Sequence, residues 1–168
     1  MRSLSSSRWR TISPQPPILE RCRALLCHRA EMAGVELQVE AEAGLPPLVC
    51  DAGELEQMLL ALGLNGIEAT PAEGRVAVTA RRDGEELLIQ VSDTGAGIPD
   101  AIRDHIFEPF FTTKEQGKGV GLGLAVVYGI VERHRGRIEV DSREGAGTVF
   151  AVHLPWRPPG AADATEET

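Results

Sequence analysis

The order of apolar and polar positions along the chain predicts helices near its start and between later strands. Residues 18–33 place apolar side chains at helical spacing, and Gly34 ends the pattern. Residues 51–69 carry two apolar stripes, as expected of a helix that is covered on most sides. A further helical pattern runs from Gly123 to Gly136. The chain is therefore expected to form about three helices.

The remaining apolar runs have the alternation or the length of strands. Helices before and between strands that pair mainly as antiparallel neighbours predict an α+β fold, a two-layer α/β sandwich. Its mixed, mostly antiparallel sheet would be covered by the helices on one face. The strands are expected at residues 35–41, 75–80, 86–91, 137–141 and 148–154.

Both ends of the chain lack such patterns. Residues 1–13 hold five serines and three arginines, and residues 157–168 are rich in proline, alanine and acidic side chains. We expect residues 1–13 to be a disordered or linker tail and residues 156–168 to be a disordered tail. Residues 14–155 are then the folded domain.

Composition and charge narrow the class of protein. A length of 168 residues, with 42% hydrophobic and 25% charged side chains, fits one globular domain. The net charge of −8 argues against a nucleic-acid binder. No apolar run approaches the roughly 18 residues of a membrane helix. Three cysteines without metal-ligand spacing favour reduced thiols and therefore a cytoplasmic location. We also expect the isolated domain to be monomeric, without direct membrane insertion.

A carboxylate followed by two glycines is the first candidate for chemistry. Asp93 lies two residues after the expected strand 86–91, and Gly95 and Gly97 follow it. Glycines there permit backbone angles and close approach that other residues do not. An aspartate beside such a loop can accept a hydrogen bond from an amino group such as that of adenine. A tight turn after a strand, without a ligand, is the alternative.

Glycines at alternate positions mark a second candidate. Gly117, Gly119, Gly121 and Gly123 run into a helical pattern, so free N–H groups and a helix dipole could meet a phosphate. The spacing matches neither a Walker loop nor a dinucleotide fingerprint. A flexible hinge before a helix remains the alternative.

A polar amide, that of Asn65, lies inside the apolar stretch of the helix expected at residues 51–69. Asp51 and Glu54 have the spacing of an N-cap and the third helical residue, which predicts that this helix begins at Asp51. Asn65 needs a partner if it is buried, and its carbonyl oxygen suits Mg²⁺ beside phosphate oxygens. A core asparagine bonded to a neighbouring carbonyl is the alternative.

A cluster of aromatic residues precedes the glycines. Phe107, Phe110 and Phe111 crowd into five positions, which suggests an anchor at one end of a loop. The following residues 112–118 are polar and include Lys114 and Lys118, as expected of a mobile lid over phosphates.

Taken in order, these motifs resemble the ATP-binding domain of sensor histidine kinases, a HATPase_c domain of the GHKL superfamily. Residues 65–69, 93–98, 107–114 and 119–124 resemble its N box, first glycine box, F box and second glycine box. Residues 144–150 resemble the turn before its final strand. The resemblance implies the Bergerat fold, and the F box resembles that of the nitrogen-sensor-like branch.

The resemblance implies ATP and Mg²⁺ as ligands. It implies that Asp93 selects adenine, that Asn65 holds Mg²⁺, and that lysines and glycine amides bind the β- and γ-phosphates. The implied ATP-binding residues are Asn65, Glu68, Asp93, Gly95, Gly97, Ile98, Phe107, Thr112, Thr113, Lys114, Lys118, Gly119, Val120, Gly121, Leu122, Gly123, Leu124 and Thr148.

Three positions qualify this resemblance. Ala61 stands where hydrolysing relatives have a catalytic glutamate and many kinases a second asparagine, which argues against gyrase-like hydrolysis. Val120 stands where threonine is frequent. Both put robust activity in doubt. Glu68 is either a second metal-shell residue or a solvated surface glutamate.

None of the four histidines lies in a phosphoacceptor motif. His28 is soon followed by an acidic residue but by no nearby proline. His105 precedes the F box, His134 ends a helical pattern and His153 lies in the last expected strand. We therefore expect phosphoryl transfer to a histidine on a separate dimerisation domain, and indirectly to a response regulator. The alternatives are a serine kinase of the anti-sigma type and a non-catalytic ATP-sensing module.

Overall fold

The computed structural model describes residues 9–12, 18–109, 111, 123–159 and 165–166. Within these segments the chain forms four helices and eight strands. In chain order they are β1 (Trp9–Ile12), α1 (Ile18–Ala33), β2 (Glu36–Ala41), β3 (Leu48–Asp51), α2 (Ala52–Ala69), β4 (Arg75–Asp83), β5 (Glu86–Asp93), α3 (Asp100–Arg103), α4 (Gly123–Arg133), β6 (Arg137–Ser142), β7 (Thr148–Pro155) and β8 (Thr165–Glu166).

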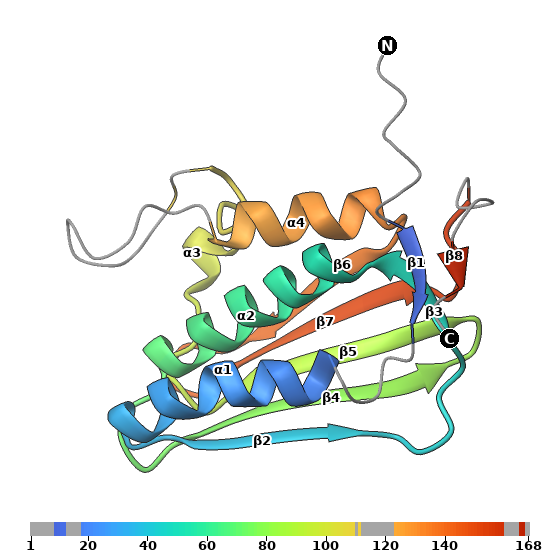
Figure 1. The fold of residues 1–168 in the computed structure, drawn as a ribbon. Helices are drawn as coiled ribbons and strands as arrows, with labels where there is room; N and C mark the ends of the chain where they lie inside the picture. Colours follow the sequence, from blue (N-terminus) through green and yellow to red (C-terminus); the bar gives the residue numbers. More distant parts are fainter. Residues whose placement is uncertain (1–8, 13–17, 110, 112–122, 160–164, 167–168) are drawn as a thin grey trace.

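The main sheet and its helices form two layers. Five strands pair in the order β2-β4-β5-β7-β6, with β2 and β4 parallel and the other neighbours antiparallel. The helices α1, α2 and α4 lie together on one face of this sheet (Figure 1). The predicted α+β sandwich with a mixed, mostly antiparallel sheet is confirmed. Among the described helices, none has the length and apolarity to cross a membrane.

A second, smaller sheet was not expected. Strand β1 pairs antiparallel with β3 and parallel with β8. β1 and β8 lie in the two end segments for which the sequence predicted no element. β3 lies just before the predicted helix of residues 51–69, where no strand was expected. Figure 1 shows this sheet at the end of the helical layer opposite α3.

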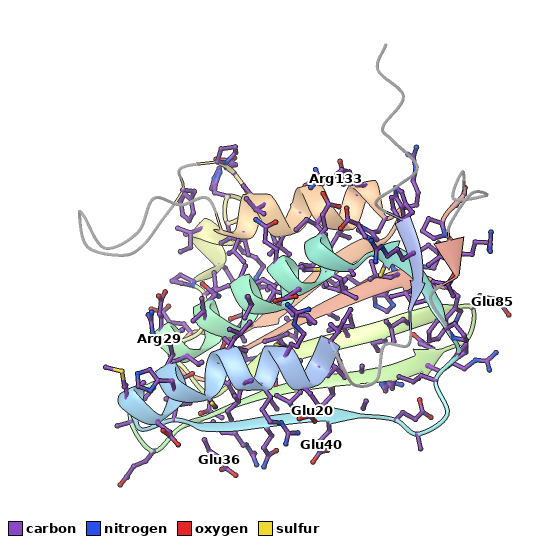
Figure 2. All side chains as sticks on the ribbon, viewed as in Figure 1. Glu20, Arg29, Glu36, Glu40, Glu85 and Arg133 are labelled. Carbon is purple, nitrogen blue, oxygen red and sulfur yellow. The ribbon has the colours of Figure 1, made fainter. Side chains whose placement is uncertain are left out.

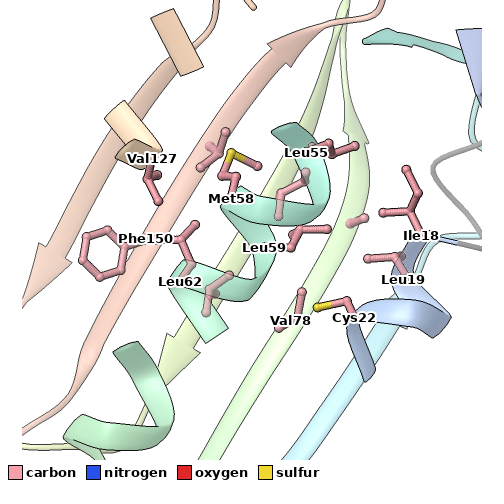
Figure 3. Close-up of a cluster of buried hydrophobic side chains, with 14 of the residues drawn as sticks. Ile18, Leu19, Cys22, Leu55, Met58, Leu59, Leu62, Val78, Val127 and Phe150 are labelled. Atoms are coloured by element: carbon pink, nitrogen blue, oxygen red, sulfur yellow. The ribbon is translucent and has the colours of Figure 1, made fainter. Parts of the chain in front are cut away.

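Helix α2 is the centre of the core. Its start is capped as predicted, since the Asp51 carboxylate accepts the Glu54 N–H at 3.1 Å. Its buried stripe meets side chains from the sheet and from both neighbouring helices (Figure 3). Gly63 allows α1 to pack closely, because an added Cβ would lie 2.4 Å from Leu26 Cδ1. The core thus fixes the direction of α2 relative to the sheet.

Candidate nucleotide-binding site

Asp93 lies where β5 ends and the first glycine loop begins. The residue is buried, with 8% of its surface exposed. Its Oδ1 accepts the Gly95 N–H at 2.9 Å. Burial raises the pKa of the Asp93 carboxyl, while hydrogen bonds from the Gly95 and Thr148 N–H groups act to lower it. The result is an oriented carboxylate acceptor in a largely dry position.

The loop after Asp93 fits only because two of its residues are glycines. A Cβ on Gly95 would lie 2.3 Å from the Ala69 carbonyl oxygen, at the end of α2. Gly97 has φ +74°, and a Cβ there would lie 1.9 Å from the Arg143 carbonyl oxygen. The Ala96 N–H also donates to the Ala69 carbonyl at 3.2 Å. The loop is therefore clamped between α2 and the β6–β7 turn.

A buried hydroxyl network fastens the other side of this loop. Ser142 Oγ accepts the Ile98 N–H at 2.7 Å and donates to the Gly147 carbonyl at 3.0 Å. Since its one proton is used, Thr148 Oγ1 donates to Ser142 Oγ at 2.8 Å. Ile98 and Thr148 were candidates from the sequence, whereas Ser142 was not, because no motif marks it.

The structure brings the second half of α2 next to Asp93. A Cβ added to Gly66 would lie 3.7 Å from the Asp93 Cβ and 3.3 Å from Val76. Asn65 precedes Gly66 and is half-buried. Motifs that lie 28 positions apart in the sequence, at Asn65 and Asp93, thus border one region of the fold.

Glu68 is engaged with the neighbouring helix. Its Oε1 lies 3.6 Å from the Arg29 guanidinium of α1, and both side chains are partly exposed. Arg29 lies near the last turn of α1 (Figure 2). This ion pair ties α1 to α2 one turn beyond Asn65, a role that the sequence did not suggest.

The first aromatic of the F box is anchored on the core. The Phe107 ring centroid lies 5.7 Å from that of Tyr128 on α4 and 6.3 Å from that of Phe150 on β7. Leu124, in the first turn of α4, is half-buried beside this core. Gly123 begins α4 with open space around its Cβ position. Eight further candidates lie outside the described residues: Thr112, Thr113, Lys114, Lys118, Gly119, Val120, Gly121 and Leu122.

Comparisons with known proteins agree with this geometry. Residues 50–158 match the family described as "Histidine kinase-, DNA gyrase B-, and HSP90-like ATPase". Sensor kinase CckA of Brucella abortus (strain 2308) is 36% identical over 90% of this chain and 18% of its own length. Sensor histidine kinase ZraS of Escherichia coli (strain K12) is 44% identical over 78% of this chain and 28% of its own length. The chain thus spans less than a third of these relatives.

Solved structures show the same fold. The catalytic domain of histidine kinase ThkA superposes with a TM-score of 0.76 at 29% identity, covering 86% of this chain and 93% of that one. Full-length ShkA in complex with AMPPNP superposes with a TM-score of 0.75 at 33% identity, covering 84% of this chain and 30% of that one.

Proposed function

Because the chain belongs to the family of histidine kinase-, DNA gyrase B- and HSP90-like ATPases, we propose that it is the ATP-binding catalytic domain of a two-component sensor kinase. It transfers the γ-phosphoryl group of ATP to a histidine on a separate dimerisation domain, from which a response regulator is phosphorylated. The buried Asp93 carboxylate beside the Gly95–Gly97 loop is the observation that carries the proposal.

Asp93 would accept a hydrogen bond from the adenine amino group. Its Oδ1 already holds the Gly95 N–H, so the carboxylate keeps its orientation before the base arrives. The glycine loop packs closely against the Ala69 and Arg143 carbonyls, which fixes its backbone beside the carboxylate. The complex of ShkA with AMPPNP supports an adenine nucleotide as the ligand.

Mg²⁺ would supply charge neutralisation for the triphosphate, with Asn65 as the proposed protein ligand. The amide of Asn65 is half-buried in α2, close to the Asp93 loop, and an amide oxygen is a hard ligand. Glu68 is held by Arg29, so we propose that it positions the α1–α2 pair.

Asn65→Ala is expected to abolish most of the improvement that Mg²⁺ gives to ATP affinity, because the ion loses its protein ligand. The fold should persist, since alanine suits a helix. Calorimetry with and without Mg²⁺ measures the effect. Gln57→Ala removes an exposed amide from the same helix and is the matched control. If Mg²⁺ still improves affinity in Asn65→Ala as in the parent, Asn65 is not the ligand.

The domain alone should retain almost no protein-bound phosphate after incubation with labelled ATP. None of its histidines lies in an acceptor motif, so transfer needs a second domain. Adding a dimerisation domain of the ZraS type should produce label that is lost in acid, as phosphohistidine is. Strong self-labelling at His28, His105, His134 or His153 contradicts transfer in trans.

The same experiment separates the two alternatives. Acid-stable label on a partner protein would indicate a serine kinase of the anti-sigma type. ATP binding without transfer to any tested partner would favour an ATP-sensing module. The similarity to ZraS over 78% of the chain favours the histidine kinase.

We also propose the finer assignments made from the sequence. The F-box resemblance and the identity to ZraS support the nitrogen-sensor-like branch. The free thiols of Cys22, Cys27 and Cys50 fit a cytoplasmic location. Residues 14–155 form the catalytic domain, which acts as a monomer, and residues 112–118 act as its lid. Ala61, at the position of the catalytic glutamate of hydrolysing relatives, argues against gyrase-like ATP hydrolysis.

A further inference from the structure

The end of the helical layer away from Asp93 is built around one buried histidine. His134 directly follows α4 and is only 1% exposed. Its Nδ1 donates to the Ile130 carbonyl at 2.8 Å, since a carbonyl can only accept. Its Nε2 accepts the Asp51 N–H at 3.1 Å. The ring is therefore held as one neutral tautomer between the last turn of α4 and the cap of α2.

The same ring contacts the first strand. Trp9 of β1 stacks against His134, with ring centroids 4.7 Å apart and planes at 50°. Strand β1 also pairs with β3, in a register that sets Trp9 opposite Asp51. Two independent contacts thus place β1 on the residue that caps α2.

An ion pair closes this junction. Arg133 Nε donates to Glu54 Oε1 at 2.8 Å, and the Glu54 N–H donates to the Asp51 carboxylate at 3.1 Å. Figure 2 shows Arg133 near the end of α4 that faces β1. The start of α2, the end of α4 and strand β1 are consequently fastened to one another.

Both helices carry candidate nucleotide residues at their other ends. Helix α2 runs from this junction to Asn65, a distance of roughly 20 Å at helical rise. Helix α4 runs to the junction from Gly123, and Figure 1 shows the two helices side by side. Because helices are stiff over such lengths, a shift at the junction displaces their nucleotide ends as well.

We propose that His134 is a positioning residue that couples strand β1 to the nucleotide site, so that docking of β1 and binding of ATP favour each other. This inference rests on the proposed function. By reciprocity, whatever displaces β1 lowers ATP affinity, and ATP in turn holds β1 in place.

Protonation of His134 would open the junction, because a proton on Nε2 points at the Asp51 N–H. Burial is the largest cause that lowers the pKa of His134, and the positive charge of Arg133 lowers it further. The hydrogen bond to the Ile130 carbonyl and the negative charges of Glu54 and Asp51 raise this pKa, but by less. The unfolded chain takes up this proton near the ordinary value of 6.5, and the folded domain only at lower pH. The free energy of unfolding therefore falls as the pH drops below that value.

The test compares ATP affinity, with Mg²⁺ present, in the parent and three variants. Trp9→Ala and His134→Phe should weaken ATP binding about fivefold at neutral pH in domains that remain folded. His134→Gln should retain most of the affinity, because its amide can both donate and accept. As the pH drops below 6.5, the free energy of unfolding of the parent should fall, and His134→Gln should lack the part of this fall that comes from the histidine.

Matched controls are Trp156→Ala, beside β3 at the edge of the core, and His28→Gln on the exposed side of α1. Amide hydrogen exchange in the parent is a second measurement that needs no substitution, and ATP should slow the exchange of residues 9–12. If a folded Trp9→Ala domain binds ATP as tightly as the parent, or if ATP does not change amide exchange in β1, the coupling is wrong and the proposed function still stands. A parent domain that does not bind ATP overturns the proposed function as well.

Discussion

Asp93→Asn is expected to weaken ATP binding tenfold or more, on the order of the 1.5–3 kcal/mol of a hydrogen bond to a charged group. The Asn oxygen can keep the Gly95 N–H bond that Asp93 Oδ1 now accepts. The amide NH₂ then faces the adenine amino group, and two donors oppose each other. Because the substitution conserves volume, the domain should remain folded. Calorimetry of ATP binding measures the loss.

Three comparisons sharpen this test. GTP should bind the parent poorly, because guanine presents a carbonyl where adenine presents its amino group. Asp141→Asn removes an exposed carboxylate from β6 and should leave ATP affinity unchanged. Burial raises the pKa of Asp93, so as the pH is lowered its carboxylate takes up a proton earlier than an ordinary aspartate does. The ATP affinity of the parent should fall with this protonation, and Asp93→Asn should lack the fall. Equal affinity of the parent for ATP and GTP contradicts the assignment.

Local signals explain why the central helix and the position of the loop after Asp93 could be predicted. Asp51 and Glu54 mark the start of α2 within four residues, and the Glu54 N–H donates to the Asp51 carboxylate in the structure. Asp93 follows a mostly apolar run, which placed it at a strand end. The hairpin of β4 and β5 also follows from adjacent segments with a short turn. In each case the deciding interactions lie close together in sequence.

The missed features depend on contacts between distant segments. Strands β1 and β3 have four residues each, too few for a period-two pattern to stand out. Their pairing joins segments almost 40 residues apart. Ser142 lies 44 residues from Ile98, whose N–H it accepts, and nothing in its surroundings marks the hydroxyl. His134 looks like any histidine at a helix end until Trp9 and Asp51 are brought against it.

Gly97→Ala is expected to cost about 2 kcal/mol more of the free energy of unfolding than Gly44→Ala. Both glycines have φ +74°, so both alanines carry the same left-handed strain. An alanine Cβ at position 44 meets nothing within 4 Å, whereas at position 97 it lies 1.9 Å from the Arg143 carbonyl oxygen. The difference between the two variants therefore isolates the collision from the backbone strain.

Relief of that collision requires the Asp93 loop to move away from the β6–β7 turn. Movement would pull the Ile98 N–H from Ser142 Oγ and disturb the backbone on which adenine is proposed to lie. Gly97→Ala should thus lose ATP affinity as well as stability, while Gly44→Ala, in the connection between β2 and β3, should keep its ATP affinity. Urea unfolding and calorimetry on the same samples measure both quantities. Equal stabilities of the two variants would mean that the loop does not need glycine at position 97 for close packing.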